Sequence, residues 1–167
     1  MLNYQTGHTT PWWNDDFKKL NYTRYKLTND YDVKRWRSEG YNNITFGGST
    51  CNMTQKLPND SDKFLELFNW DDCAISYYCM LTNDILPLHQ DQYPGYIKRN
   101  NIKDTSVLHK AVVFLEDWKS GHYFEMDNDA IINWKAGDWI SWDYDTPHMA
   151  ANIGTEPRYT LQITGHK

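Results

Sequence analysis

The sequence predicts a mainly β fold of the sandwich or barrel type. After the first 70 residues, short apolar segments alternate with turn residues at regular spacing, which is typical of antiparallel strands in such folds. The 167 residues suffice for one domain with a sizeable core. Aromatic residues make up 16% of the chain, so large rings should dominate its buried surface. We therefore expect a single domain, with a mixed segment over residues 1–70 and a β core over residues 71–167.

Two short helices are expected in the first segment. Thr10-Pro11 is a favourable helix start, because the hydroxyl can cap free N–H groups and proline fits the first helical position. This predicts a helix over residues 12–20. Ser61 can likewise open a short amphipathic helix that ends near Trp70. Gly47-Gly48, between the two helices, should lie in a loop.

The segments of the β core are separated by clear turn signals. Lys119-Ser120-Gly121 predicts a hairpin turn between two strands. The polar stretch 92–106 is either a solvated loop or a lid over a binding site, since long loops in compact domains are often functional. The predicted strands span residues 74–80, 86–91, 107–116, 122–126, 130–134, 139–143, 148–152 and 158–164.

His89 and Asp91 lie two residues apart at the end of a predicted strand. Side chains alternate with period two along a strand, so both point from the same face. A second histidine from a distant strand can complete a set of two imidazoles and one carboxylate. That set leaves three positions of an octahedral metal open and suits non-haem Fe(II) acting with O2. The alternative is an exposed histidine beside a loop carboxylate. A metal-ligating pair here favours a jelly roll, whose open mouth can hold a site.

His148 is the candidate for the second imidazole. It follows the Gly137-Asp138 turn and a predicted strand, and Pro147 restricts the backbone immediately before it. This arrangement fixes the direction in which the ring points. The alternative is a core histidine that is satisfied by a backbone carbonyl group.

Arg158 lies ten residues after His148, beyond a predicted turn. If Asn152 and Arg158 pair across that turn, then Arg158 and Thr160 face the same way as His148. Arg158 could then bind the far carboxylate of an extended dicarboxylate with two parallel hydrogen bonds, while Thr160 adds a hydroxyl donor. A surface salt bridge is the alternative for this arginine.

These residues together resemble the motif of the Fe(II)- and 2-oxoglutarate-dependent oxygenase superfamily. That motif is His-x-Asp, a distal His, and an Arg about ten residues later followed by x-Ser/Thr. The stretch 85–165 also resembles prolyl-hydroxylase-like and aspartyl/asparaginyl-hydroxylase-like members, through residues 114–118 with Gly121 and through residues 158–162. The resemblance covers roughly the C-terminal half of the chain. It implies a double-stranded β-helix, the cupin-like form of the jelly roll, with a few N-terminal helices packed on it.

The resemblance also implies a role for each residue. His89, Asp91 and His148 would be the Fe(II) ligands and form the catalytic centre. Arg158 and Thr160 would bind the distal carboxylate of 2-oxoglutarate, and O2 would be the other cosubstrate. The implied reaction hydroxylates an unactivated C–H bond, in an amino acid or an amino-acid residue of a peptide, and releases succinate and CO2.

Further candidates for binding 2-oxoglutarate follow from their positions in the strands. Tyr77 or Tyr78, on the strand before His89, could donate a hydrogen bond to the cosubstrate. His109 resembles a histidine that helps to bind the cosubstrate in aspartyl/asparaginyl-hydroxylase-like members. The alternatives are tyrosines of the core or of an interface, and a structural histidine.

Composition narrows the class of partner. The net charge of −5 argues against a nucleic-acid binder, which needs a basic face. No apolar run approaches the roughly 18 residues of a membrane span. Three cysteines, an odd number without Cys-x-x-Cys spacing, favour a reducing cytoplasm over a disulfide framework. We therefore expect a cytoplasmic protein with a small-molecule or peptide substrate.

Two rival functions remain open. The first is a cupin-like module that binds a metal or a small acid without catalysis, because the stretch from Gly137-Asp138 to Asn152 also fits a cupin. Arg158 and Thr160 discriminate against it, since a simple metal binder needs no site for a second carboxylate. The other rival is a metal-dependent isomerase or dioxygenase that needs no cosubstrate.

Overall fold

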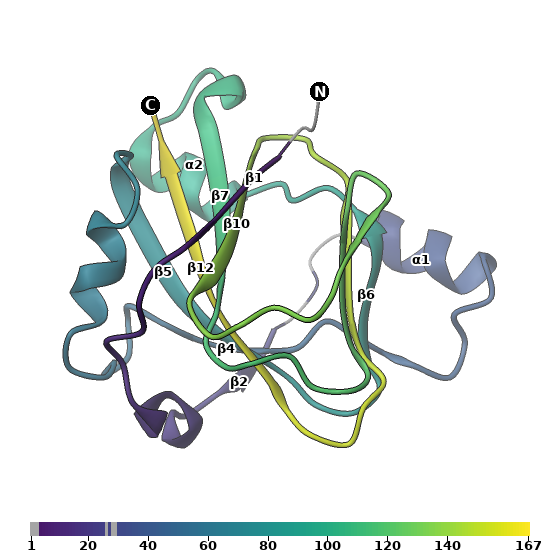
Figure 1. Ribbon diagram of the computed structural model, residues 1–167. Coiled ribbons are helices and arrows are strands. Elements are labelled where there is room, and N and C mark those ends of the chain that lie inside the picture. Colours follow the sequence, from purple (N-terminus) through teal and green to yellow (C-terminus); the bar gives the residue numbers. More distant parts are fainter. Residues whose placement is uncertain (1–3, 26, 28–29) are drawn as a thin grey trace.

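The computed structural model describes residues 4–25, 27 and 30–167 and contains two sheets that face each other (Figure 1). The seven-stranded sheet has the order β1 (Tyr4–His8), β10 (Asp138–Asp143), β7 (Leu108–Phe114), β12 (Arg158–His166), β5 (Asp71–Met80), β4 (Ser49–Asn52) and β2 (Thr23–Arg24). The five-stranded sheet has the order β3 (Thr45–Phe46), β6 (Asp84–His89), β11 (His148–Asn152), β8 (His122–Met126) and β9 (Asp129–Ile131).

From β5 onward the chain passes repeatedly from one sheet to the other. Strands β5, β7, β10 and β12 belong to the larger sheet, and β6, β8, β9 and β11 to the smaller. Among the described strands, only the β3–β6 pair is parallel. This winding is that of a jelly roll and confirms the predicted fold class. The predicted strands 122–126 and 148–152 match β8 and β11 residue for residue.

Two of the predicted hairpins are wrong. Lys119-Ser120-Gly121 connects β7 to β8, and the turn after Asn152 connects β11 to β12, so each turn crosses between the sheets. The two crossings touch, because Ile153 donates its backbone N–H to the Gly121 carbonyl oxygen at 2.9 Å. A side chain at Gly121 would collide with the backbone of Gly154, and the backbone at Gly121 has a φ of 88°. Consequently β11 and β12 face each other across the sandwich.

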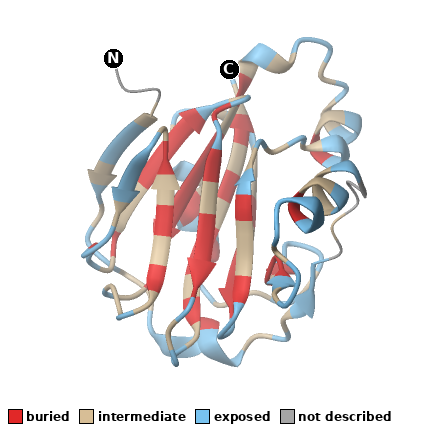
Figure 2. Ribbon diagram, turned by 90° about the vertical axis from the view of Figure 1, so that its right-hand side faces the viewer, coloured by how far each residue is buried: buried red, intermediate tan, exposed pale blue. Residues whose placement is uncertain are grey.

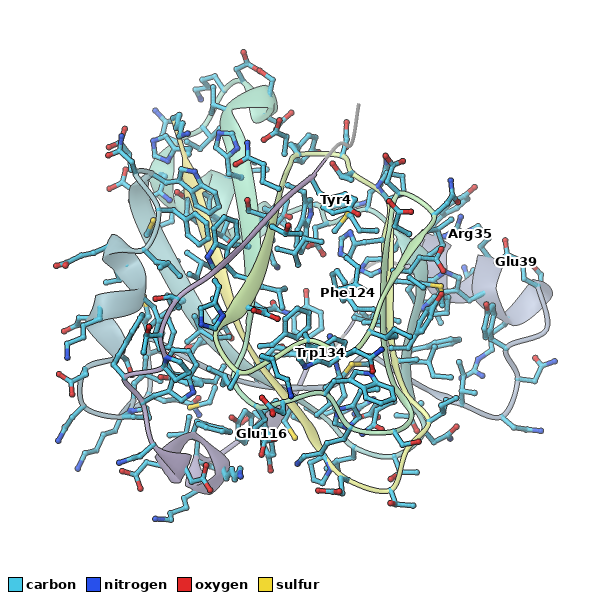
Figure 3. All side chains as sticks on the ribbon, in the orientation of Figure 1. Tyr4, Arg35, Glu39, Glu116, Phe124 and Trp134 are labelled. Carbon is cyan, nitrogen blue, oxygen red and sulfur yellow. The ribbon has the colours of Figure 1, made fainter. Side chains whose placement is uncertain are left out.

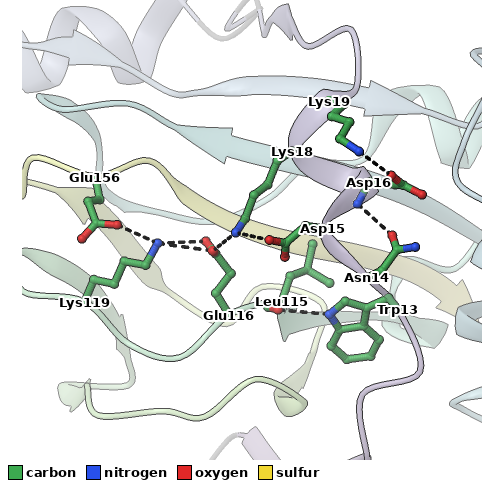
Figure 4. Close-up of polar contacts among 10 residues, drawn as sticks. All are labelled: Trp13, Asn14, Asp15, Asp16, Lys18, Lys19, Leu115, Glu116, Lys119 and Glu156. Carbon is green, nitrogen blue, oxygen red and sulfur yellow. Dashed lines mark hydrogen bonds and ion pairs between the residues drawn. The ribbon is translucent and has the colours of Figure 1, made fainter.

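The part of the N-terminal segment that precedes residue 30 is less helical than the sequence predicts. Instead of a helix over residues 12–20, a short 3₁₀ helix, η1 (Asp15–Lys19), begins after Asn14, whose side chain accepts a hydrogen bond from the Asp16 N–H group at 2.8 Å. Trp13 stays extended because its indole N–H donates to the Leu115 carbonyl oxygen at 3.0 Å (Figure 4). Lys18 adds an ion pair to Glu116, also drawn there. Packing on the sheet therefore replaces the expected helix.

The structure also differs from the prediction in its other helices. A second 3₁₀ helix, η2 (Ser61–Glu66), stands where an amphipathic α-helix is expected. Helix α1 (Asp30–Ser38), which the sequence pattern does not reveal, lies outside the smaller sheet beside β6 (Figure 1). The stretch 92–106 is not a plain loop, since it contains helix α2 (Pro94–Asn100) and the start of η3 (Thr105–Val107). None of the helices in the described part of the chain has the length and apolarity that crossing a bilayer requires.

The core has two parts because the central strands are buried on both faces (Figure 2). One part, with Phe17 and Phe64, fills the space between the larger sheet and the N-terminal segment. The other part lies between the sheets, where Phe124 and Trp134 point into the interior (Figure 3). Burying each such ring contributes on the order of 1.5–3 kcal/mol. Leu86 of β6 packs against the edge of this inner part, and a cavity begins beside it.

Candidate metal centre

Strands β6 and β11 bring three potential metal ligands together. His89 and His148 lie directly opposite each other in the antiparallel register of the two strands, with ring centroids 4.4 Å apart. Asp91 follows two residues after His89, so its carboxylate turns toward both rings. One ligand atom from each of the three residues lies within 4.8 Å of the others. The predicted triad is therefore assembled by the fold.

Backbone carbonyl groups fix the orientation of both imidazoles. His89 Nδ1 lies 2.8 Å from the Pro87 carbonyl oxygen, and His148 Nδ1 lies 2.9 Å from that of Thr146. A carbonyl oxygen only accepts hydrogen bonds, so each Nδ1 carries the proton and each Nε2 keeps its lone pair. The two Nε2 atoms are 3.7 and 3.6 Å from the oxygens of Asp91. These distances exceed a hydrogen bond, and the donor set of two imidazoles and one carboxylate fits a divalent iron ion.

The charges of the triad also suit metal binding. Burial, together with the neighbouring His89, lowers the pKa of His148 to about 4, so this ring is neutral at pH 7. Burial alone would raise the pKa of Asp91. The charge of Lys110, followed by interactions with His148 and His89, outweighs that effect and holds the pKa of Asp91 well below its usual range. A neutral imidazole and an ionised carboxylate are the protonation states that bind a metal.

We expect the metal-free protein to lose roughly 2–3 kcal/mol of stability as the pH falls from 6.5 to 4.5. The pKa of His148 is lower in the folded protein than in the unfolded chain. Between pH 6.5 and 4.5 the unfolded chain therefore binds a proton at this ring that the folded protein does not bind, and this favours unfolding. His122, whose pKa burial also lowers, acts in the same direction. Urea unfolding in the presence of a chelator measures the loss. A His148→Gln variant should show a smaller loss, and an equal loss in both proteins would contradict the assignment to His148.

The triad opens into a cavity of about 520 Å³ between the sheets, and Arg158 lines the same cavity. Arg158 is only 3% exposed. One guanidinium nitrogen, Nη1, lies 3.2 Å from the sulfur of Met80, and Nε has no hydrogen-bond partner. Within the described residues, no carboxylate forms an ion pair with it. Its guanidinium carbon instead lies 5.4–5.9 Å from the rings of Trp134, Phe124 and Phe114.

A buried cation without a counter-ion is costly, and the structure shows this cost. Burial lowers the pKa of Arg158 to about 10, which still leaves the side chain charged at pH 7. Thr160, two residues along the same face of β12, is 2% exposed and also lines the cavity. The predicted pair therefore faces the triad across the sandwich, although it does so from the opposite sheet. An arginine held in this way fits a ligand with a carboxylate group.

Two of the candidate cosubstrate-binding residues lie away from the cavity. Tyr77 points to the outer face of the larger sheet, where its hydroxyl lies 2.9 Å from the Ser61 hydroxyl. Tyr78, its neighbour, lines the cavity, and its buried hydroxyl has no hydrogen-bond partner. His109 also faces outward, 2.7 Å from Asp143 and stacked on Trp70. Successive side chains of a strand point to opposite faces of the sheet. Tyr77 and His109 point outward because their neighbours Tyr78 and Lys110 point into the cavity.

Sequence reasoning missed two residues that contact the triad. Lys110, one position after His109, forms an ion pair with Asp91 at 3.2 Å. Tyr93, which follows Asp91 and precedes α2, donates its hydroxyl to the same carboxylate at 3.0 Å. The signal for Lys110 was present, because a lysine interrupts an otherwise apolar strand at an inward position. Tyr93 lies in the stretch that was expected to be a loop or lid.

Comparisons with known proteins support the fold. No protein-family model matches the sequence, and no curated protein sequence matches it. A prolyl-4-hydroxylase from Pseudomonas putida has a similar structure, with a TM-score of 0.61 and 13% sequence identity over 99% of this chain and 93% of that chain. The fold is a double-stranded β-helix.

Two further solved structures resemble the chain more distantly. A predicted oxalate decarboxylase from Thermotoga maritima has a TM-score of 0.45 and 12% identity, over 72% of this chain and 81% of that chain. A cupin protein from Bacteroides fragilis has a TM-score of 0.41 and 13% identity, over 88% of this chain and 86% of that chain. At these identities the likeness concerns the fold, and the function has to be argued from the site.

Proposed function

We propose that the protein is an Fe(II)- and 2-oxoglutarate-dependent dioxygenase that hydroxylates an unactivated C–H bond in an amino acid or an amino-acid residue of a peptide. The observation that carries this proposal is the buried, unpaired Arg158 in the same cavity as His89, Asp91 and His148. A metal-binding module needs the three ligands alone. A cosubstrate that chelates a metal at one end and ends in a carboxylate at the other needs both features.

Each residue has a role that follows from its contacts. His89, Asp91 and His148 would hold the iron, with both rings kept in the ligating tautomer by Pro87 and Thr146. When bound, the iron and its cosubstrate would supply the O2 chemistry that breaks a strong C–H bond, with 2-oxoglutarate converted to succinate and CO2. Arg158 would bind the distal carboxylate bidentately, and Thr160 would donate its hydroxyl to the same group.

Aromatic side chains pack around the two histidines of the triad. The Trp142 ring lies 4.9 Å from His148, and the Trp36 ring lies 6.1 Å from His89, measured between centroids. Phe124 lies 6.2 Å from His148 and 6.0 Å from Trp142. Such an apolar wall strengthens electrostatic interactions inside the cavity and limits side reactions of a strong oxidant with water. The surroundings of the triad therefore suit oxidative chemistry.

Binding of 2-oxoglutarate to the Mn(II)-loaded protein tests the proposal before any substrate is known. We expect 2-oxoglutarate to raise the melting temperature of this protein, since a ligand that binds only the folded state stabilises it. The matched control is 2-oxobutyrate, which keeps the keto acid but lacks the distal carboxylate that Arg158 would bind. It should stabilise the protein far less.

An anaerobic sample with Fe(II) supplies an independent readout. The complex with 2-oxoglutarate should show a visible charge-transfer band, and succinate should accumulate in air once a suitable substrate is present. Equal stabilisation by the two keto acids, or none by either, would contradict the proposal. A bound metal without any response to 2-oxoglutarate would instead support the non-catalytic binding module.

A further inference from the structure

Lys110 places a second buried cation in the cavity, close to the metal ligands. It occupies an inward position of β7, where it pairs in register with Trp142 of β10 and Thr164 of β12. The residue is 9% exposed. Its ammonium group lies 3.2 Å from Asp91 Oδ2 and donates to Gln162 Oε1, also at 3.2 Å. In the described part of the chain, Asp91 supplies the one carboxylate that pairs with it.

The charges of the proposed complex do not balance without a further anion. The two positive charges of the metal ion are matched by Asp91 and by the carboxylate of 2-oxoglutarate that chelates the metal. The distal carboxylate of 2-oxoglutarate matches Arg158. Because the metal ion then takes the charge of Asp91, Lys110, which is 9% exposed, is left without a counter-ion in the cavity. Buried charges are paired in folded proteins, since an unpaired one is strongly unfavourable.

The cavity wall beside Lys110 is polar but uncharged. Gln162, Ser76 and Asn52 form one row across β12, β5 and β4, as the register of these strands shows. All three line the cavity together with Thr164, which pairs with Lys110. Amide and hydroxyl groups can hydrogen-bond the rest of a polar molecule, but they cannot neutralise an ammonium group. Asp32, another carboxylate that lines the cavity, already pairs with Arg35 at 3.4 Å, so the missing negative charge is left for a ligand to supply.

We propose, on the basis of the function proposed above, that the substrate supplies this charge as a carboxylate that pairs with Lys110. The carbon to be hydroxylated would then lie close to that carboxylate, because Lys110 contacts a metal ligand directly. The carboxylate belongs either to a free amino acid or to an Asp or Glu side chain within a peptide. Gln162 would act as a positioning residue that holds the ammonium group.

Matched acids and amides distinguish these sources. Succinate release by the wild-type protein is measured with the free amino acids and their α-carboxamides, and with N-acetylated, C-amidated peptides that contain Asp, Glu, Asn or Gln. At least one acid should be turned over at least tenfold faster than its amide partner. A response confined to free amino acids identifies the α-carboxylate as the group at Lys110, and a response to capped Asp or Glu peptides identifies a side chain.

Binding measurements with Lys110 variants test the contact itself. In the anaerobic Mn(II)–2-oxoglutarate complex, calorimetry should show at least tenfold weaker binding of the active acid to Lys110→Met and partial recovery with Lys110→Arg. The affinities for Mn(II) and 2-oxoglutarate should stay within about threefold of wild type. Lys135→Met is the control, since Lys135 is 71% exposed and pairs with Asp117 at the surface; it should bind the acid as wild type does.

Three outcomes would overturn the inference. The first is a panel in which no acid is turned over, or in which amides react as fast as acids. The second is undiminished binding of the active acid by Lys110→Met. The third is weakened Mn(II) binding by both Lys110 variants, which would show that the lysine only supports Asp91. A wild-type protein that fails to bind 2-oxoglutarate would refute the proposed function itself, and calorimetry detects that failure before any acid is added.

Discussion

Replacing Arg158 with methionine should raise the Kd for 2-oxoglutarate by roughly a hundredfold or more, since hydrogen bonds to charged groups contribute about 1.5–3 kcal/mol each and a bidentate pair contains two. The same change should stabilise the ligand-free protein. Burial lowers the pKa of Arg158 to about 10, so the charged form is unfavourable by on the order of 3 kcal/mol in the folded state. This destabilisation is fully present at neutral pH and declines as the pH rises through about 10, where the folded protein gives up the proton.

Calorimetry with the Mn(II)-loaded protein measures the affinity, and urea unfolding of the metal-free protein measures the stability. Methionine suits the site because the neighbours of Arg158 are Met80 and three aromatic rings. Arg158→Lys is the matched control, which keeps the charge but loses the bidentate geometry, and its affinity should lie between those of the other two proteins. Loss of Mn(II) binding by Arg158→Met would contradict the role of this arginine as a carboxylate-binding residue.

Replacing Asp91 with alanine should reduce both metal affinity and succinate formation by more than about a hundredfold. Removing a residue that merely supports a ligand costs about 10–100-fold, and the loss of a ligand itself should cost more. In addition, the variant leaves the ammonium group of Lys110 without its carboxylate partner. Mn(II) titration followed by electron paramagnetic resonance, with succinate quantified in parallel, measures both effects.

Asp143→Ala is a suitable control for this experiment. Asp143 also pairs with a histidine, His109, but its side chain is 76% exposed and lies outside the cavity. The control should bind Mn(II) as the wild type does. Turnover that survives in Asp91→Ala would show that another residue completes the metal site.

The sequence predicted the three candidate metal ligands because each of them carries a local signal. Asp91 lies two residues after His89, just beyond the end of β6, and Pro147 precedes a histidine whose Nδ1 is fixed by a backbone carbonyl group. The strands of the core were found for the same reason, since each is a short segment bounded by turn residues. The confirmed parts of the prediction therefore rest on signals that lie within a few residues of each other, although the fold brings His89 and His148 together from distant segments.

The errors concern contacts between distant segments. A turn signal does not say whether the next strand pairs with the last one or crosses to the other sheet, and both false hairpins arose in this way. The sequence also does not determine which residues of a strand face inward. It leaves Tyr77 and Tyr78 as alternatives, of which Tyr78 reaches the cavity, and it points to His109 where Lys110 reaches the cavity. The N-terminal segment follows packing against the sheet, as the extended Trp13 shows.

The contact between the two crossings at Gly121 and Gly154 has a consequence for the length of ligand that the cavity accepts. The crossing that contains Gly154 leads directly into Arg158, and the tight backbone contact with Gly121 leaves no space for that crossing to shift. The spacing between the backbone of Arg158 and the strands that carry the candidate metal ligands is thus fixed by main-chain atoms, which cannot rotate away as side chains do. Under the proposed function this fixed spacing selects the cosubstrate by its length. We therefore expect the protein not to bind 2-oxoadipate, which is one methylene longer than 2-oxoglutarate.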